Sequence, residues 1–392
     1  MNKKLIIVGN GAAGNSALEE ILASGEAFDI TVVTMEATPP YYRPMLSEYI
    51  SETEIPNRFY LHNHDWYVTH GIDIKYETAL DEIHPELKTI KLSNGEELQY
   101  DSLILATGSR NFIPPIPGID KSNVLNLRDL TDAETLKKFA WHKKTAVIIG
   151  GGLLGLELGW QMTKLNVEVT VVEMMERLLP RQLDAEASVL FEEKVKETGI
   201  KVIKGVQTKE IIGTEVAHGV LLSDGTILPA DFIAVSIGVR AETTSARKAG
   251  INTDRAIIVD DFMKTNIEGI FAAGDCAEYK GVNYAIWPEA IEQGRIAALN
   301  ALGKNVPYVP VTPFNIYHGL NLRLFSIGDV GSDTNASYDI YSYSTEDHFE
   351  KFFYKSGKVV GGILIGDISK SSKLKRAVTE EMSREDFESM LN

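Results

Sequence analysis

The chain has 392 residues, of which 44% are hydrophobic and 24% are charged, a composition typical of a globular protein. This length predicts two or three domains. The formal net charge of -16 excludes a general binder of nucleic acid or of anionic membranes. No apolar run is long enough to cross a membrane, and residues 1–4 lead into a strand instead of a signal peptide, so we expect a cytoplasmic protein. The single cysteine, Cys276, excludes an internal disulfide, and we expect no bound metal ion.

The first motif lies at residues 5–14, which read L-I-I-V-G-N-G-A-A-G. The apolar run has the length and branching of a strand buried on both faces. It ends on Gly9, Gly11 and Gly14, which have the G-x-G-x-x-G spacing of a dinucleotide site. The three glycines serve a tight turn, a close approach of the backbone to a pyrophosphate, and packing of the next helix on the strand. The N-terminus of that helix offers N–H groups and a positive dipole end to the phosphates.

The context of this motif strengthens the prediction. A second strand is expected at residues 30–34, and Glu36 stands 22 residues beyond Gly14. An acidic side chain near that distance can accept hydrogen bonds from the hydroxyls of a ribose. The alternative is a βαβ unit that binds no nucleotide and has a solvated glutamate. The order of strand, glycines, helix and acid favours the cofactor site.

Between the first motif and residue 146, the sequence predicts irregular segments together with short strands and a helix. Prolines in residues 38–50 force an extended connection, which is either a rigid surface loop or a plug that packs into the core. We expect an antiparallel meander over 72–100 and a buried strand at 102–105. Residues 111–118 carry three prolines and are typical of a hinge between domains. Next, Thr131-x-x-Glu134 is a capping-box signature that opens a helix.

The opening pattern repeats at residues 146–173. A buried strand leads into Gly150, Gly152 and Gly155, and after a helix and a strand comes Glu173, 18 residues beyond the last of these glycines. Two such motifs predict two bound dinucleotides and transfer between them; the alternative is a duplicated fold with one inactive site. A carboxylate at Glu173 repels a 2′-phosphate, so we expect NADH to be preferred over NADPH. We interpret the nearby Arg177 as a surface or adenine-stacking residue.

The remaining chain predicts further strands, two helices and a third domain. We expect a helix at 184–197, strands at 231–235 and 269–273, and a helix at 287–302 with Pro288 well placed in its first turn. A proline-rich stretch at 307–313 marks a boundary. Alternating strands, including 338–344, 348–354 and 359–365, followed by a helical tail, predict an α+β domain.

Four motifs in order carry a resemblance to a known family: G-N-G-A-A-G at 9–14, A-T-G at 106–108, G-G-G-L-L-G-L-E at 150–157 and G-D at 274–275. Over essentially its whole length the chain resembles the FAD-dependent pyridine nucleotide reductases that have two dinucleotide-binding domains. The fold class implied is α/β, with two Rossmann-like three-layer domains and a small C-terminal α+β domain. We place an FAD-binding domain at 1–110 and 240–312, an NAD(H)-binding domain at 111–239, and the C-terminal domain at 313–392.

The resemblance implies that the first motif holds FAD and that the second holds NAD(P)H. The residues assigned to FAD are Gly9, Gly11, Ala12, Ala13, Gly14, Glu36, Arg43, Pro44, Ala79, Ala106, Thr107, Gly108, Arg128, Asp275, Trp287 and Pro288. The residues assigned to NAD are Gly150, Gly152, Leu153, Leu154, Gly155, Glu157, Glu173, Ile237 and Gly238.

The implied roles of the FAD residues follow their chemistry. Asp275 would hydrogen-bond the ribityl or pyrophosphate region, and Arg43 and Arg128 would lie along the FAD, where an arginine suits a pyrophosphate. The backbone near Ala79 would contact the adenine. The helix that begins at Trp287 would direct its positive dipole end at the flavin pyrimidine edge. The alternative is that the Trp287 side chain is an ordinary core aromatic.

The absence of a redox cysteine decides the subclass. Disulfide reductases and related peroxidases of this superfamily carry one or two cysteines where this chain has Y-Y-R-P-M-L-S-E at 41–48. Disulfide, coenzyme A disulfide and cysteine-dependent peroxide reduction are therefore not expected. We expect Cys276 to be a small buried packing residue. The R-P-x-L-S stretch is similar to that of rubredoxin and ferredoxin reductases, many of which have a lysine where this chain has Glu48. An ion pair with Glu157 is therefore impossible.

Residues 317–329 look most like the C-terminal domain of prokaryotic NADH:rubredoxin reductases. The expected function is electron transfer from NADH through FAD to rubredoxin or a similar small iron carrier, with Glu157 and Ser47 as the catalytic candidates. The alternatives are an NADH-linked reductase of a flavodiiron protein, ferredoxin or oxygen, a flavoprotein component of a nitrite reductase, and a non-enzymatic NADH-sensing flavoprotein. Basic residues at 370–376 fit a solvated helix face better than a docking site. The sequence makes no prediction of the oligomeric state.

Overall fold

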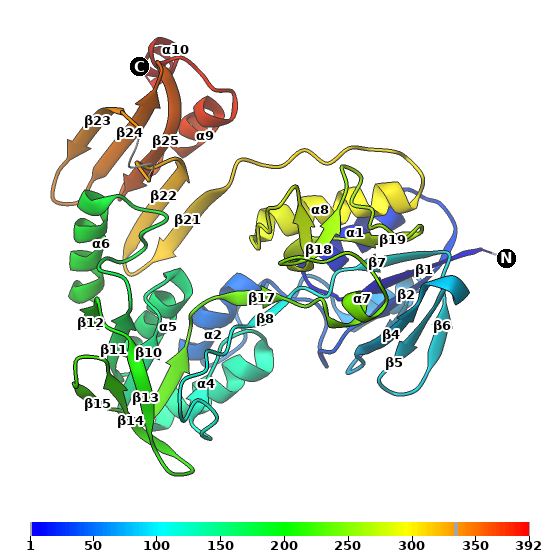
Figure 1. Cartoon of the computed structure of the whole chain (residues 1–392), viewed down its shortest axis with the longest axis horizontal. Helices are drawn as coiled ribbons and strands as arrows, with labels where there is room; N and C mark the ends of the chain where they lie inside the picture. Colours follow the sequence, from blue (N-terminus) through cyan, green and yellow to red (C-terminus); the bar gives the residue numbers. More distant parts are fainter. Residues whose placement is uncertain (1, 333–335, 392) are drawn as a thin grey trace. The chain divides into compact units, whose positions relative to one another are not determined.

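The computed structural model describes residues 2–332 and 336–391, which fold into two compact units (Figure 1). Unit 1 comprises Met1–Arg43, Pro56–Arg110 and Val239–Val311, and unit 2 comprises Pro44–Ile55, Asn111–Gly238 and Thr312–Asn392. The outermost residues of the predicted domains, 1 and 392, lie outside the described residues. The division into FAD, NAD and C-terminal domains stays a prediction. No helix in the described part of the chain is both long and apolar enough to span a bilayer.

Unit 1 is built on a five-stranded sheet in the order β19-β7-β1-β2-β3, in which all neighbours are parallel. Its strands are β1 (Lys3–Val8), β2 (Phe28–Val33), β3 (Asp73–Lys75), β7 (Ser102–Leu105) and β19 (Ile270–Ala272). The apolar side chains of β1 are buried on both faces, as expected for a central parallel strand. A second, antiparallel sheet of β4 (Leu80–His84), β5 (Thr89–Leu92) and β6 (Glu97–Gln99) shares the same hydrophobic core through Ile83 and Ile90.

The predicted meander over 72–100 is therefore wrong at its first strand. Residues of β3 pair in parallel with β2 and extend the main sheet, while only β4, β5 and β6 form the meander. A strand as short and polar as β3 has little periodicity, so its pairing partner could not be predicted from the sequence.

Two helices of unit 1 pack closely against each other. They are α1 (Ala12–Ala23) and α8 (Trp287–Ala301), and α8 begins with a proline in its first turn as predicted. The contact depends on Gly294, where a Cβ atom would lie 2.2 Å from the carbonyl oxygen of Ala13. Only a glycine allows the two backbones to come this close. The shorter elements of unit 1 are α3 (His64–Thr69), η2 (Pro85–Leu87), β8 (Ser109–Asn111), β17 (Val239–Ala241), α7 (Thr244–Lys248), β18 (Ile257–Val259), η3 (Gly274–Cys276) and β20 (Ala277–Tyr279).

Unit 2 contains a second parallel sheet in the order β12-β11-β10-β16-β9. Its strands are β9 (Val124–Leu125), β10 (Thr145–Ile149), β11 (Glu168–Glu173), β12 (Lys201–Lys204) and β16 (Phe232–Val235). The helices of this part are α2 (Leu46–Ser51), α4 (Leu130–His142), α5 (Leu153–Lys164) and α6 (Ala185–Glu197). An antiparallel sheet of β13 (Thr208–Gly213), β14 (Ala217–Leu222) and β15 (Ile227–Pro229) completes it. The helix α2 packs against both α4 and α5.

The predicted capping box of α4 is wrong. The N-cap is Asp129, whose carboxylate accepts a hydrogen bond of 2.9 Å from the backbone N–H of Asp132. Thr131 lies inside the helix instead. Asp129 and Thr131 are both acceptable N-caps, and the helix begins two residues earlier than expected, with Asp129 as its cap.

The C-terminal part of unit 2 is an antiparallel sheet in the order β21-β22-β25-β24-β23 with two helices (Figure 1). Its elements are β21 (Phe314–Gly319), β22 (Leu322–Gly328), β23 (Asp339–Ser344), β24 (Phe349–Lys355), β25 (Lys358–Ile365), α9 (Ser371–Thr379) and α10 (Arg384–Leu391). Phe352 and Phe387 pack edge to face at 5.0 Å in its core. Buried Lys351 of this sheet forms ion pairs of 2.6 Å and 2.8 Å with Asp184 and Glu186 at the start of α6. The predicted fold class is confirmed.

We predict that Gly294→Ala lowers the stability of the protein even though alanine is the better helix former by about 1 kcal/mol. Because the added methyl group collides with the backbone of α1, we expect a net loss of about 2 kcal/mol in the free energy of unfolding. Urea denaturation followed by circular dichroism measures this loss. Ile291→Ala, on the exposed side of the same helix, is the control and should change stability little. Equal stability of G294A and the unaltered protein would contradict the packing argument.

Candidate functional site

The first glycine loop, between β1 and α1, is shaped by two close backbone contacts. Gly9 has a φ of +106°, and a Cβ atom on it would lie 2.0 Å from the carbonyl oxygen of Ala106. A Cβ on Gly14 would lie 1.9 Å from the carbonyl oxygen of Gly9. The loop is therefore folded back tightly against the end of β7 and against its own helix, which no residue with a side chain would allow.

The space above Gly11 is different, because it is open. The nearest atom to a Cβ built there is Nε of Arg43, at 3.9 Å. Gly11 is also the N-cap residue of α1, so the amide groups of the first helical turn face this space. Helix N–H groups, a positive dipole end and an arginine together fit a diphosphate. Binding of a dinucleotide at this loop stays a prediction.

The acid predicted to contact a ribose, Glu36, lies just beyond β2 and is held in place. The hydroxyl of Tyr41 donates a hydrogen bond of 2.5 Å to its carboxylate, and the guanidinium of Arg43 forms an ion pair with its other oxygen. Tyr41 is buried and stacks on Phe59 with ring centres 5.0 Å apart. Of the two alternatives for this irregular segment, the structure therefore supports a packing plug at Tyr41.

The G-D motif lies beside the same loop. A Cβ atom on Gly274 would lie 2.9 Å from Cβ of Ala13, and the N–H of Gly274 donates a hydrogen bond of 2.9 Å to Gln293. The hydroxyl of Ser109 donates a hydrogen bond of 2.6 Å to the carboxylate of Asp275. Cys276 is fully buried, as predicted, and burial raises the pKa of its thiol. The thiol is thus a packing group.

The other residues assigned to FAD are divided between the two units. Trp287 is half-buried and meets Tyr42 edge to face at 5.1 Å, so it is not an ordinary core aromatic. Both backbone groups of Ala79 are hydrogen-bonded to Ser93, and its contact with adenine stays a prediction. Arg128 and Pro44 belong to unit 2. Ala12, Thr107, Gly108 and Pro288 lie in unit 1 at the ends of α1, β7 and α8.

The second glycine loop, between β10 and α5, repeats the same contacts. Gly150 has a φ of +111°, and a Cβ atom on it would lie 2.2 Å from the carbonyl oxygen of Ser236 and 3.0 Å from Ile237. A Cβ on Gly155 would lie 2.3 Å from the carbonyl oxygen of Gly150. Around Gly152, the N-cap of α5, a Cβ atom would meet no described atom within 4 Å. Leu153 and Leu154 begin α5. Gly238 comes directly after Ile237, which lies close to Gly150.

Glu173, at the end of β11, is bound to this second loop. Its two carboxylate oxygens accept hydrogen bonds of 2.7 Å from the N–H of Gly151 and 2.8 Å from the N–H of Met175. The acid is therefore fixed at the loop. Arg177 donates a hydrogen bond of 3.2 Å to the carbonyl oxygen of Pro180, so its guanidinium is engaged with its own turn.

The carboxyl group of Glu157 on α5 has an unusual pKa. Burial, with a smaller contribution from the charge of Glu48, raises its pKa to about 7, against weaker opposing effects of Ser47 and Lys164. Among the described residues no lysine or arginine forms an ion pair with it. Ser47 is buried in α2, which packs against α5, the helix of Glu157, while Glu48 is exposed. The structure thus brings the two catalytic candidates together.

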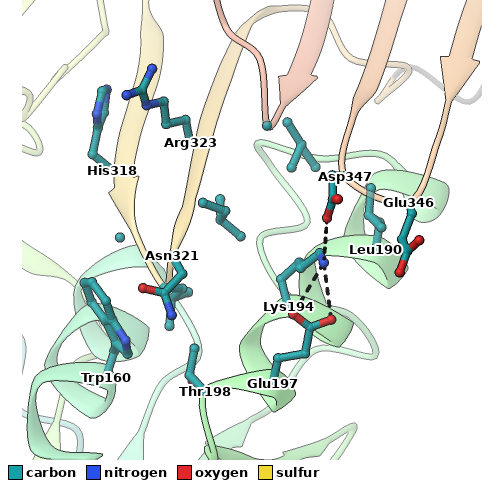
Figure 2. Close-up of a pocket in the computed structure, with 15 residues that line it drawn as sticks. Trp160, Leu190, Lys194, Glu197, Thr198, His318, Asn321, Arg323, Glu346 and Asp347 are labelled. Atoms are coloured by element: carbon teal, nitrogen blue, oxygen red, sulfur yellow. Dashed lines mark hydrogen bonds and ion pairs between the residues drawn. The ribbon is translucent and has the colours of Figure 1, made fainter. Parts of the chain in front are cut away.

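Unit 2 also contains a cleft of about 630 Å³ that the sequence did not indicate (Figure 2). It lies between α5 and α6 on one side and the turns of the C-terminal sheet on the other. Lys194 spans it with ion pairs of 3.3 Å to Glu197 and 3.3 Å to Asp347 (Figure 2). Trp160 and Asn321 line its opposite end. None of the predicted site residues lines it.

Comparison with known proteins finds two family models and several relatives that match this chain. The family model "Pyridine nucleotide-disulphide oxidoreductase" matches residues 3–294, and the model "Rubredoxin NAD+ reductase C-terminal domain" matches residues 313–382. The chain is 30% identical to an NADH-rubredoxin oxidoreductase of Clostridium acetobutylicum, over 99% of this chain and 97% of that one. It is 34% identical to a nitrite reductase [NAD(P)H] of Bacillus subtilis over 97% of its own length but only 47% of the relative's, so it spans about half of that protein.

Solved structures agree with these relatives. The reductase in a crystal structure of a covalent putidaredoxin reductase–putidaredoxin complex is 27% identical to this chain. The two superpose with a TM-score of 0.89, over 97% of this chain and 94% of that one.

We predict that two substitutions in the second loop separate binding from stability. Gly152→Ala adds a methyl group to open space, so it should leave stability unchanged but weaken dinucleotide binding by about tenfold or more, since it blocks the approach to the backbone. Gly155→Ala should instead destabilise unit 2 by about 2 kcal/mol through its collision with Gly150. Thermal unfolding and NADH titration measure the two effects. Unchanged NADH affinity in G152A would contradict the assignment of this loop.

Proposed function

The chain belongs to the pyridine nucleotide-disulphide oxidoreductase family and is an oxidoreductase, and on this premise we propose that it transfers electrons from NADH through FAD to rubredoxin or a similar small iron carrier. Reductases of this family use FAD and NAD(P)H and serve small electron carriers. The observation that carries the proposal is the sequence at 41–48, which follows the FAD motif without a cysteine. No thiol at this position can take electrons from the flavin, so they leave it for an external acceptor.

FAD would be held by the first glycine loop. The N–H groups at the start of α1 and the guanidinium of Arg43 would bind the diphosphate, and Glu36 would accept hydrogen bonds from the ribose. Asp275, oriented by Ser109, would bind the ribityl region. When bound, the flavin would accept a hydride from NADH and pass on its two electrons one at a time, with the proton released to solvent. In this proposal residues 1–110 and 240–312 form the FAD domain.

NADH would be held by the second loop, within residues 111–239. The N–H groups of α5 would bind its diphosphate, with Gly152 leaving room for the approach. Glu173 would hydrogen-bond the adenosine ribose, and its charge would repel the 2′-phosphate of NADPH. The preference for NADH is supported by the position of this carboxylate at the loop. The cytoplasmic location is also part of the proposal and rests on the sequence alone.

The acceptor is supported by the C-terminal domain, at residues 313–392. Its match to the rubredoxin reductase C-terminal domain and the whole-length relative in Clostridium acetobutylicum favour rubredoxin. Three of the basic residues of the tail are engaged in contacts within this domain. Lys370 pairs with Glu350 at 2.7 Å, Arg376 pairs with Glu380 at 3.1 Å, and Lys375 lies over the ring of Phe314. These contacts fit a solvated helix face.

A second candidate is delivery of electrons within a nitrite-reducing system. It is favoured by the 34% identity to the nitrite reductase of Bacillus subtilis. The flavin chemistry would be the same, and only the acceptor would differ.

The test of the proposal is a comparison of acceptors. Purified flavoprotein is supplied with NADH and with rubredoxin, ferredoxin, a flavodiiron protein or oxygen in turn, and NADH oxidation is followed by absorbance. We expect the highest kcat/KM with rubredoxin. Fast turnover with oxygen and no reduction of any one-electron carrier would contradict the acceptor assignment. Reduced flavin that persists for minutes with every acceptor present would instead indicate an NADH sensor.

We predict that Glu173→Gln reduces the preference for NADH. Removing the charge removes the repulsion of the 2′-phosphate, so the ratio of kcat/KM for NADH to that for NADPH should fall on the order of tenfold. Stopped-flow reduction of the flavin with each nucleotide gives this ratio. The control is Glu168→Gln at the exposed opposite end of β11, which should leave the ratio unchanged. A ratio in E173Q equal to that of the unaltered protein would show that this carboxylate does not select the nucleotide.

A further inference from the structure

A continuous series of hydrogen bonds in unit 1 begins at the G-D motif. The N–H of Gly274 donates a hydrogen bond of 2.9 Å to Oε1 of Gln293 on α8. Nε2 of Gln293 donates one of 3.3 Å to the hydroxyl oxygen of Tyr308, and that hydroxyl donates to Oε2 of Glu289 in the first turn of α8. Oε1 of Glu289 accepts a hydrogen bond of 2.7 Å from the N–H of Val311. These groups, here named the Gly274 network, join the G-D motif to the segment that follows α8.

The Gly274 network is closed to water. Glu289 is 1% exposed, and Gln293 and Tyr308 are each 2% exposed. A buried polar group that loses its partner cannot replace it with solvent, so the loss of one link is costly. Each member therefore depends on the next.

The donors of the Gly274 network all point in one direction. Both oxygens of the Glu289 carboxylate accept hydrogen bonds, so the hydroxyl of Tyr308 donates to it and accepts from Gln293. Burial, together with the hydrogen bond to Glu289, raises the pKa of Tyr308, so the hydroxyl keeps its proton. The amide of Gln293 then turns its NH₂ group to Tyr308 and its oxygen to Gly274. A reversed amide would present a donor to a donor and leave the N–H of Gly274 unsatisfied.

Gly274 occupies a crowded position beside the first glycine loop. Its φ is +79°, and a Cβ atom built on it would lie 2.9 Å from Cβ of Ala13 in the first turn of α1. The next residue is Asp275, whose carboxylate is oriented by Ser109. Because the two residues share one peptide group, a shift of Gly274 also moves Asp275 relative to the loop.

We propose that Gln293 and Tyr308 are positioning residues of the FAD site, which act through Gly274 to hold Asp275 where it binds the ribityl region. Glu289 is the acceptor that sets the direction of the network. The inference rests on the proposed function, because it takes the first glycine loop and the G-D motif as the FAD site.

The segment around Tyr308 is also fixed without its hydroxyl. The N–H of Tyr308 donates a hydrogen bond of 2.7 Å to the carbonyl oxygen of Asp261, and its ring packs edge to face on Tyr279 at 5.0 Å. The side-chain amide of Asn300 bonds both backbone groups of Val306 at 2.8 Å. Loss of the hydroxyl should therefore break the Gly274 network and leave the segment in place.

Tyr308→Phe tests the network at this link. We expect the dissociation constant for FAD to rise about tenfold, because the amide of Gln293 loses the acceptor that orients it. The purified holoprotein is diluted, and the released FAD is measured by its fluorescence, which increases when it leaves the protein. Circular dichroism of the bound flavin in the visible range reports its surroundings and should change as well.

Tyr279→Phe is the matched control. Tyr279 is 5% exposed, packs on the ring of Tyr308 and donates a hydrogen bond of 2.6 Å to Asp261, outside the Gly274 network. It should lower thermal stability about as much as Y308F, since each loses one buried hydroxyl, and leave FAD affinity and flavin dichroism unchanged. Equal losses of FAD affinity in the two variants would overturn the proposal, because only the general stability of unit 1 would then matter.

Gln293→Met tests the other link. Methionine is of similar length but lacks the amide that accepts from Gly274, so FAD affinity should fall at least as much as in Y308F. Because the hydroxyl of Tyr308 acts through Gln293, the double variant Q293M/Y308F should bind FAD no more weakly than Q293M. Losses that multiply in the double variant would show that the two residues act separately and would overturn the network.

Two further outcomes separate this inference from the proposed function. FAD affinity in Y308F and Q293M equal to that of the unaltered protein would overturn the inference and leave the proposed function intact. An unaltered protein that is purified without FAD and does not bind it when supplied would overturn both.

Discussion

The close approach of backbone to backbone at the two glycine loops is the constraint on which the rest of the structure depends. Gly9 lies against Ala106 and Gly150 against Ser236, at distances that leave no room for a Cβ atom. These contacts join the strand before each glycine loop to its neighbour in the sheet and direct the following helix, so that its N-terminus faces open space. The acids at the ends of the next strands are then brought to the loops by the order of strands in the sheet. Binding groups far apart in the sequence meet because of this topology.

Much of the fold, and the glycine loops and acids of the candidate site, could be predicted from the sequence. Strands such as β1 and β10 are continuous apolar runs, and the glycines that follow them at fixed spacing predict a turn with a positive φ. Glu36 and Glu173 could be found because their distance from the glycines is set by the length of one helix and one strand. The strands of the C-terminal domain could be predicted from their alternating pattern. In each case a local pattern was sufficient.

The rest depended on contacts that no local pattern encodes. Gly294 and Gln293 support the first loop from α8, far away in the chain, and a glycine inside a helix gives no sign of its partner. The packing of β21 against α5 joins the C-terminal sheet to the helix that follows the second loop, and no pattern in either segment predicts it. The error at the start of α4 has a similar origin, since Asp129 and Thr131 are both acceptable N-caps and the choice depends on the tertiary fold.

The central claim is that electrons enter as a pair from NADH and leave singly for a small carrier, with no thiol between them. The most direct measurement is the stoichiometry of an anaerobic reaction, in which limiting NADH is added to the flavoprotein with an excess of oxidised rubredoxin. Because a hydride carries a pair of electrons, each NADH consumed should reduce two rubredoxin molecules. Consumption of NADH that leaves rubredoxin oxidised would contradict the claim.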